Sequence, residues 1–115
     1  MSDDVAVVRS AASLSDAETG IRDIATRTDE LRLDTFAAIE VRNMILLASQ
    51  IVASAAFREE SRGGQFRSDF STREPGLDGE HQIVQATGDG FIRTYGHLHD
   101  VLPRCAPVEP VAVAQ

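Results

Sequence analysis

Residues 58–70, which read REESRGGQFRSDF, hold the side chains of this chain that are best suited to chemistry. Three arginines and three acidic residues stand in this segment, and an arginine guanidinium can bridge a carboxylate through two parallel hydrogen bonds. Gly63 and Gly64 let the backbone turn and approach a partner closely. Two interpretations are open: the segment is a helix end stabilised by ion pairs, or it is a docking surface. The predicted cluster, with no catalytic role for any member, consists of Arg58, Glu60, Arg62, Gly63, Arg67 and Asp69.

The three histidines and the single cysteine offer weaker chemistry. On a strand, His97 and His99 would share a face close to Asp100, but so few ligands fall short of the usual complement of a structural metal site. We therefore expect exposed histidines and no metal. His81 could act as a general base, yet no nucleophile or paired carboxylate is tied to it by spacing. Cys105 stands among prolines without a basic neighbour, so we expect an inert thiol.

Two helices are expected to position the charged segment. The first has Ser13 as its N-cap and Asp16 as the capping-box partner, and it ends near Thr28. Its apolar residues recur at spacings of three and four, which places them on one face. These residues are Leu14, Ala17, Ile21, Ile24 and Ala25.

The second helix is expected to begin at Asp34 or Thr35 and to continue to Arg62, where two glycines end it. It is apolar over most of its circumference, which predicts that it is buried on several sides. Its longest apolar stretch, residues 44–57, is interrupted by polar residues. We expect this stretch to be too short and too polar to span a bilayer.

After the second helix, an irregular stretch leads to two β-prone runs, HQIVQA and FIRTYG, which flank a glycine-containing loop. This pattern predicts a β-hairpin. The fold class is therefore mainly α: a small helical bundle followed by a short C-terminal β-hairpin. Residues 1–100 are expected to form one domain, and residues 101–115, rich in proline, a flexible tail.

Composition narrows the classes of partner and location. The chain has 115 residues and a net charge of −7, which disfavours nucleic acid and acidic membrane surfaces as partners. One cysteine excludes an internal disulfide, so a reducing cytoplasm is the expected compartment. The N-terminus, MSDDVAV, lacks the basic stretch and apolar core of a secretory signal.

The pattern RxESRGxxxRxDF, preceded by a long helix that begins IEVRNMILLA, resembles the C-terminal domain of the succinate dehydrogenase and fumarate reductase flavoproteins and of L-aspartate oxidase. The similarity extends from the VVRS segment at residues 7–10 to the strand that follows Gly90. The resemblance implies a spectrin-repeat-like bundle, from which most of one helix is missing here. Gln65 departs from the histidine that the family usually has, and Ser71 from its proline.

The resemblance implies that FAD belongs to a partner subunit, since the family's flavin sits in a separate dinucleotide-binding domain. The sequence contains no GxGxxG fingerprint. The glycines at residues 88–90 lie in the expected hairpin loop with no helix after them, which argues against a phosphate-binding loop. We therefore expect this chain to bind no cofactor by itself.

The resemblance leads to one functional hypothesis and two alternatives. The chain would be a detached C-terminal domain or accessory subunit of an FAD-dependent oxidoreductase. It would support a flavin-bearing subunit of the L-aspartate oxidase or succinate dehydrogenase/fumarate reductase type, with L-aspartate oxidase favoured by the short hairpin. Alternatively, it is a non-catalytic helical interaction module, or a gene remnant that has kept the fold. The expected partners are a flavin-bearing oxidoreductase subunit or further copies of the chain, without direct membrane insertion.

Overall fold

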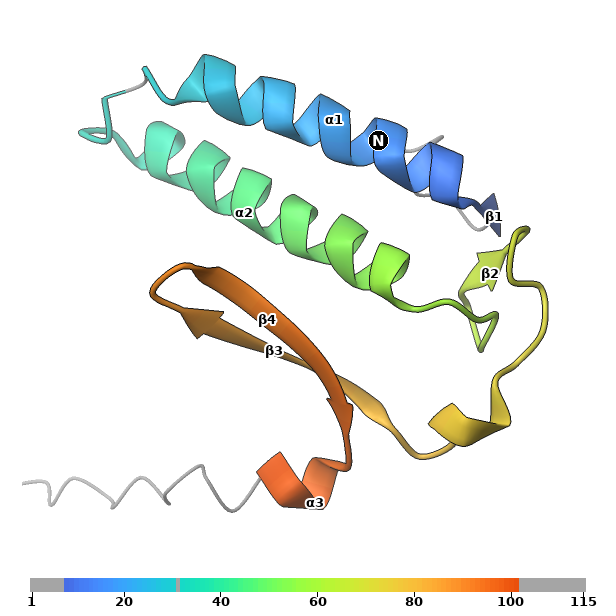
Figure 1. Cartoon of the computed structure of the whole chain (residues 1–115). Helices are drawn as coiled ribbons and strands as arrows, with labels where there is room; N and C mark the ends of the chain where they lie inside the picture. The colour runs from blue at the N-terminus through green and yellow to red at the C-terminus, as the bar shows by residue number, and fades with distance from the viewer. Residues whose placement is uncertain (1–7, 31, 102–115) are drawn as a thin grey trace, which may run out of the picture. The chain divides into compact units, whose positions relative to one another are not determined.

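The computed structural model describes residues 8–30 and 32–101, which belong to two compact units, Met1–Glu74 and Pro75–Gln115. The first unit contains two long helices packed against each other, and the second contains an antiparallel hairpin (Figure 1). The predicted mainly helical fold with a following β-hairpin is therefore confirmed. The predicted tail lies almost entirely outside the described residues.

The helical unit consists of four elements: β1 (Val8–Arg9), α1 (Ala11–Thr28), α2 (Phe36–Phe57) and β2 (Phe66–Arg67). β1 and β2 pair in parallel, with Val8 opposite Phe66 and Arg9 opposite Arg67. This pairing was not predicted, because two-residue strands carry no periodic signal. It joins the segment before α1 to the segment after α2.

α1 begins three residues earlier than predicted. Its N-cap is Ser10, whose backbone is extended and whose hydroxyl oxygen accepts from the Ser13 N–H at 3.2 Å. The Ser10 N–H in turn donates to the Ser13 hydroxyl oxygen at 3.0 Å, completing a capping box. The prediction of Ser13 as the N-cap was wrong because a serine can take either role in the box. The helix ends at Thr28, as predicted.

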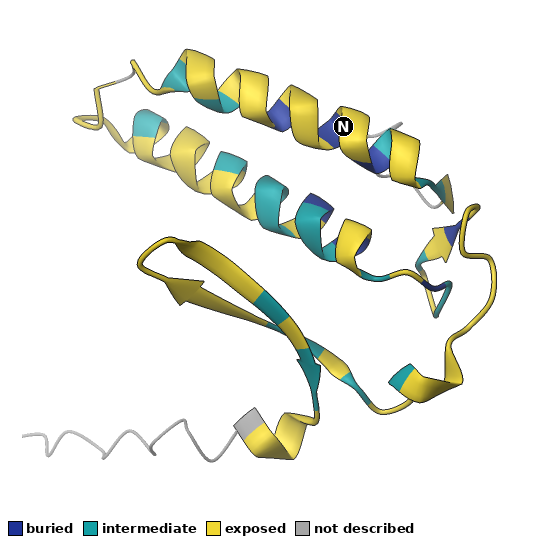
Figure 2. Cartoon of the chain, viewed as in Figure 1, coloured by how far each residue is buried: buried dark blue, intermediate teal, exposed yellow. Residues whose placement is uncertain are grey.

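A narrow core seam holds the two helices together (Figure 2). α1 buries Leu14, Ala17 and Ile21, which belong to the predicted apolar face. α2 buries only Val52 and Ala55. Partly buried side chains of α2 extend this seam, and burial of apolar area is the main force that holds such a helix pair together.

α2 begins where expected but ends five residues early. Thr35 is its N-cap, and the hydroxyl oxygen accepts from the Ala38 N–H at 3.2 Å. The helix stops at Phe57, since Arg58 takes an extended conformation with φ −84° and ψ 103°. The predicted end at Arg62 was wrong: ion pairs and hydrogen bonds of residues 58–74 hold that backbone outside the helix, and helix propensity cannot anticipate them.

Much of α2 is apolar and exposed, with Phe36 at 88%, Met44 at 69% and Leu47 at 62%. Among the described residues, α2 is the one helix long and apolar enough to cross a membrane by length and composition. The expectation from residues 44–57 considered only part of this helix, which continues to Phe36 with further apolar residues. A core helix of a soluble protein meets the same criteria, but only 6% of the apolar window is buried here.

The second unit contains η1 (Pro75–Leu77), β3 (His81–Thr87), β4 (Gly90–Gly96) and α3 (Leu98–Val101). β3 and β4 pair antiparallel from His81 opposite Gly96 to Thr87 opposite Gly90, which confirms the predicted hairpin. Gly90 has φ +136°, a conformation that favours glycine at the loop.

The buried seam predicts contrasting effects for one substitution at two leucines. Leu14→Ala should lower the free energy of unfolding by about 2 to 5 kcal/mol, because it opens a cavity in the seam. Leu47→Ala, at an exposed position, should change it by less than about 1 kcal/mol. Urea unfolding followed by circular dichroism measures both, and equal losses would contradict the assignment of the core.

The exposed apolar residues of α2 predict that the isolated chain either self-associates or presents an exposed apolar surface in solution. Large apolar patches are rare on soluble monomers, so the purified chain should self-associate or bind a hydrophobic dye at micromolar concentration. The double substitution Met44→Gln and Leu47→Gln should reduce both effects. Light scattering that shows a folded monomer without dye binding would refute this expectation.

Candidate functional site: the charged loop after α2

The buried Glu60 carboxylate lies at the centre of the charged loop, defined here as residues 58–74. Its side chain is 0% exposed. One oxygen, Oε1, accepts from Arg58 Nη1 at 2.5 Å and from Arg62 Nε at 2.9 Å. The other, Oε2, accepts from Arg62 Nη2 at 3.1 Å and from the Glu74 N–H at 2.8 Å. Both oxygens of the buried carboxylate are therefore satisfied.

Arg62 connects the beginning of the charged loop to its end at Glu74. Besides holding Glu60, its Nη2 donates to the Glu74 carbonyl oxygen at 3.0 Å. Its backbone exchanges hydrogen bonds with Gln65 at 2.9 and 3.0 Å across Gly63 and Gly64. Gly63 has φ +57°, which disfavours other residues, so its place in the predicted cluster reflects backbone geometry.

A second ion pair joins Arg67, which is only 3% exposed, to Asp69. Arg67 Nε donates to Oδ1 at 3.0 Å, and Nη2 donates to Oδ2 at 2.6 Å. Arg67 Nη1 also donates to the carbonyl oxygens of Ala56 and Arg58 at the end of α2, at 2.8 and 3.2 Å. Asp69 Oδ2 accepts from the Ala11 N–H at 3.1 Å, at the start of α1. The pair therefore satisfies unpaired backbone groups at the ends of both helices.

Gln65 was not in the predicted cluster, but it belongs to it structurally. Its Nε2 donates to the carbonyl oxygens of Ala55 and Arg58 at 3.4 and 3.3 Å. Its Oε1 accepts from Arg9 Nη1 at 3.3 Å. In the sequence, Gln65 was noted only because the family usually has histidine at this position. That difference did not indicate that Gln65 bonds to the end of α2 and to Arg9.

The electrostatics of the charged loop favour permanent ion pairs over proton transfer. The hydrogen bond from Arg62 is the largest influence on Glu60 and holds the pKa of its carboxyl below the usual range, while burial acts in the opposite direction. The hydrogen bond from Arg67 likewise lowers the pKa of the Asp69 carboxyl. Both groups are therefore ionised at neutral pH. The arrangement can position backbone, and its proposed docking role stays a prediction.

The histidines do not assemble a metal centre with other described residues. His97 follows β4, and His99 lies in α3, so the predicted placement of both on one strand was wrong. His97 Nε2 lies 3.0 Å from Glu80 Oε1, and the two imidazole rings stack with centroids 5.4 Å apart. No group of three or more potential metal ligands occurs among the described residues. His81 begins β3, and Cys105 lies outside the described residues.

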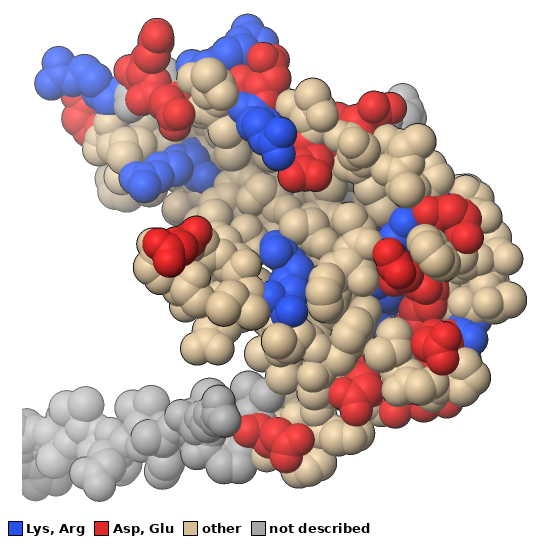
Figure 3. Space-filling model, viewed as in Figure 1, with Lys and Arg blue, Asp and Glu red and all other residues tan. Residues whose placement is uncertain are grey.

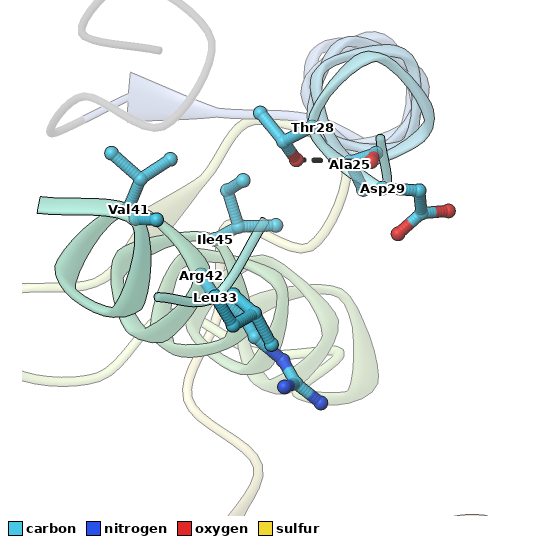
Figure 4. A pocket seen from close by; sticks show the side chains of 8 residues that line it. Ala25, Thr28, Asp29, Leu33, Val41, Arg42 and Ile45 are labelled. Carbon is cyan, nitrogen blue, oxygen red and sulfur yellow. Dashed lines mark hydrogen bonds between the residues drawn. The ribbon is translucent and has the colours of Figure 1, made fainter. Parts of the chain in front are cut away.

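The helical unit also carries open hollows along the α1–α2 groove. One of about 300 Å³ is lined by residues that include Ala25, Asp29, Leu33 and Arg42 (Figure 4). Another of about 330 Å³ is lined only by apolar residues, including Ile24, Met44 and Leu47. Charged side chains gather over α1, at the top of the view in Figure 3. The surfaces along α2 suit apolar packing better than recognition of a polar small molecule.

A family profile agrees with this arrangement. The profile described as "Fumarate reductase flavoprotein C-term" matches residues 1–99. The chain is 36% identical over 80 residues to a fumarate reductase (CoM/CoB) subunit of Methanothermobacter marburgensis, covering 63% of the chain and 15% of that protein. It is 53% identical over 45 residues to the L-aspartate oxidase of Halalkalibacterium halodurans, covering 39% of the chain and 8% of that protein.

A third relative is the fumarate reductase flavoprotein subunit of Mycobacterium tuberculosis, 37% identical over 75 residues, covering 65% of the chain and 13% of the relative. The chain thus spans 8 to 15% of these curated relatives.

Solved structures share the fold. Mycobacterium smegmatis Sdh1 in complex with UQ1 superposes with a TM-score of 0.70 at 20% identity, covering 81% of this chain and 18% of that one. A mutant Escherichia coli quinol fumarate reductase FrdA superposes with a TM-score of 0.68 at 17% identity, covering 91% and 19%.

The buried carboxylate predicts a large difference between two neighbouring glutamates. Glu60→Gln should lower the free energy of unfolding by about 3 kcal/mol at neutral pH, because it leaves Arg58 and Arg62 without a countercharge. Glu59→Gln, at an exposed neighbour, should change it by less than about 0.5 kcal/mol. Urea unfolding of both variants provides the comparison, and similar values would contradict the central role of Glu60.

The lowered pKa values predict acid sensitivity. A carboxyl whose folded-state pKa lies below its unfolded value contributes stability that is complete above the unfolded pKa, about 4. This contribution is lost as the pH falls through the folded pKa. Wild type should therefore lose stability in this acidic window, and Glu60→Gln should lose less. Thermal melts across the window provide the measurement, and parallel pH profiles would argue against the assignment.

Proposed function

Since the chain belongs to the family of C-terminal domains of fumarate reductase and succinate dehydrogenase flavoproteins, with an L-aspartate oxidase among its homologues, we propose that it supports a flavin-bearing oxidoreductase body. In this role the chain contributes a packing surface and no catalytic group. The charged loop holds the two helices and the chain that follows them in place. The flavin-bearing body is a detached subunit or the remainder of the same assembly.

One observation carries this proposal: α2 is long and apolar, yet α1 buries only a narrow seam of it. Exposed apolar side chains on both sides of the seam include Phe36, Met44, Leu46 and Leu47. At about 25 cal/mol per Å² of apolar area, covering several such side chains stabilises a complex by several kcal/mol. A partner surface against α2 therefore has a substantial driving force, and membership of this family favours a flavoprotein as that partner.

The described residues of the chain do not fit FAD. A dinucleotide site needs a glycine-rich turn between a strand and a helix, where helix N–H groups meet the pyrophosphate. Here β1 leads into α1 through Ser10, without glycine, while Gly88 lies in the hairpin loop and Gly90 begins β4. We therefore place FAD on the body that α2 contacts.

The proposal predicts that FAD accompanies the chain in its source cells but not in isolation. The chain would be tagged at its own gene, purified, and denatured to release FAD for chromatographic identification. We expect near-stoichiometric FAD with wild type and little with Leu47→Glu, which places a charge on the apolar surface. The chain purified alone from a foreign host should be colourless.

Two results would overturn the proposal. If the tagged chain carries no FAD in its source cells, the interaction-module or remnant hypothesis gains. If the isolated chain carries stoichiometric FAD, the placement of the flavin on a partner is wrong. Circular dichroism of Leu47→Glu controls for folding.

A further inference from the structure

Arg42 is an unusual residue on the largely apolar helix α2, whose only other charged residue is Glu40. It lines two hollows of the α1–α2 groove, of about 300 and 340 Å³. Its neighbours along α2 include Ile45, which lines both hollows, and Leu46, which is 48% exposed. A surface that covers this side of α2 therefore also covers the Arg42 guanidinium.

Within the part of the chain that the structure describes, Arg42 forms no hydrogen bond or ion pair. The acids that line the same hollows do not neutralise it. Glu18 accepts from Arg22 at 2.9 Å, and the Arg42 side chain extends away from Asp29 (Figure 4). Arg42 differs in this from Arg58, Arg62 and Arg67 of the charged loop, which bind carboxylates.

We propose that the surface covering α2 presents a carboxylate that pairs with Arg42. The inference rests on the proposed function and adds the chemistry of the partner: an apolar surface carrying an acidic side chain. The physical reason is desolvation, because burying a guanidinium without a countercharge is costly. A planar guanidinium with several donors is well suited to a single carboxylate.

The test uses the chain tagged in its source cells, with the molar ratio of FAD to chain measured over a dilution series. Arg42→Glu should weaken the complex by roughly thirtyfold or more, because it opposes two like charges at the interface. Arg42→Lys keeps the charge and should retain most of the FAD. Arg27→Glu is the matched control: Arg27 also has no partner among the described residues and lines neither hollow.

The outcomes separate this inference from the proposed function. Loss of FAD with Arg42→Glu, but not with Arg42→Lys or Arg27→Glu, supports the carboxylate. If Arg42→Glu keeps FAD while Leu47→Glu loses it, the apolar docking stands and the carboxylate is refuted. Equal losses for the variants at Arg42 and Arg27 would indicate a general charge effect and also refute it. If wild type carries no FAD, both proposals fail.

Discussion

The structure of the helical unit depends on the buried carboxylate of Glu60. A charge without solvent must be paired and fully hydrogen-bonded, and here two arginines and a backbone N–H meet that requirement. Because these partners lie both before and after the turn at Gly63, pairing them closes the charged loop. The end of α2 and the path of the chain toward residue 75 both follow from this closure.

The Arg67–Asp69 pair extends the same constraint to α1. Arg67 satisfies carbonyl groups at the C-terminal end of α2, while Asp69 accepts the N–H of Ala11. Helix ends leave backbone groups unpaired. Here the charged side chains of Arg67 and Asp69 satisfy some of these groups. The charged loop therefore holds together two helices that share only a narrow apolar seam. This structural role accounts for the clustering of charged residues in the loop.

The narrow seam has a functional consequence. A helix that is apolar over most of its circumference is usually buried on several sides. However, α2 buries little of its surface against α1. The charged loop holds α2 in place, and the exposed apolar side chains of α2 remain available to another surface. In the proposed contact, Arg42 would add one charge to that surface, and this charge would make the contact selective for a complementary partner.

The sequence by itself determined the two helices, their order and the hairpin, because hydrophobic periodicity, the Thr35 cap and the glycine-containing loop are local signals. It also identified the family and six residues of the charged loop, through a pattern of residue types and spacing, but it missed the role of Gln65. Only the tertiary structure decided where α2 ends, because Arg58 leaves the helix where the loop pairs its side chain with Glu60. The same holds for the Ser10 cap, which lies beside the strand pairing of residues 8–9 with residues 66–67. Contacts between residues more than fifty positions apart, such as Ala11 with Asp69, leave no periodic trace in a sequence, because they depend on how the helices pack.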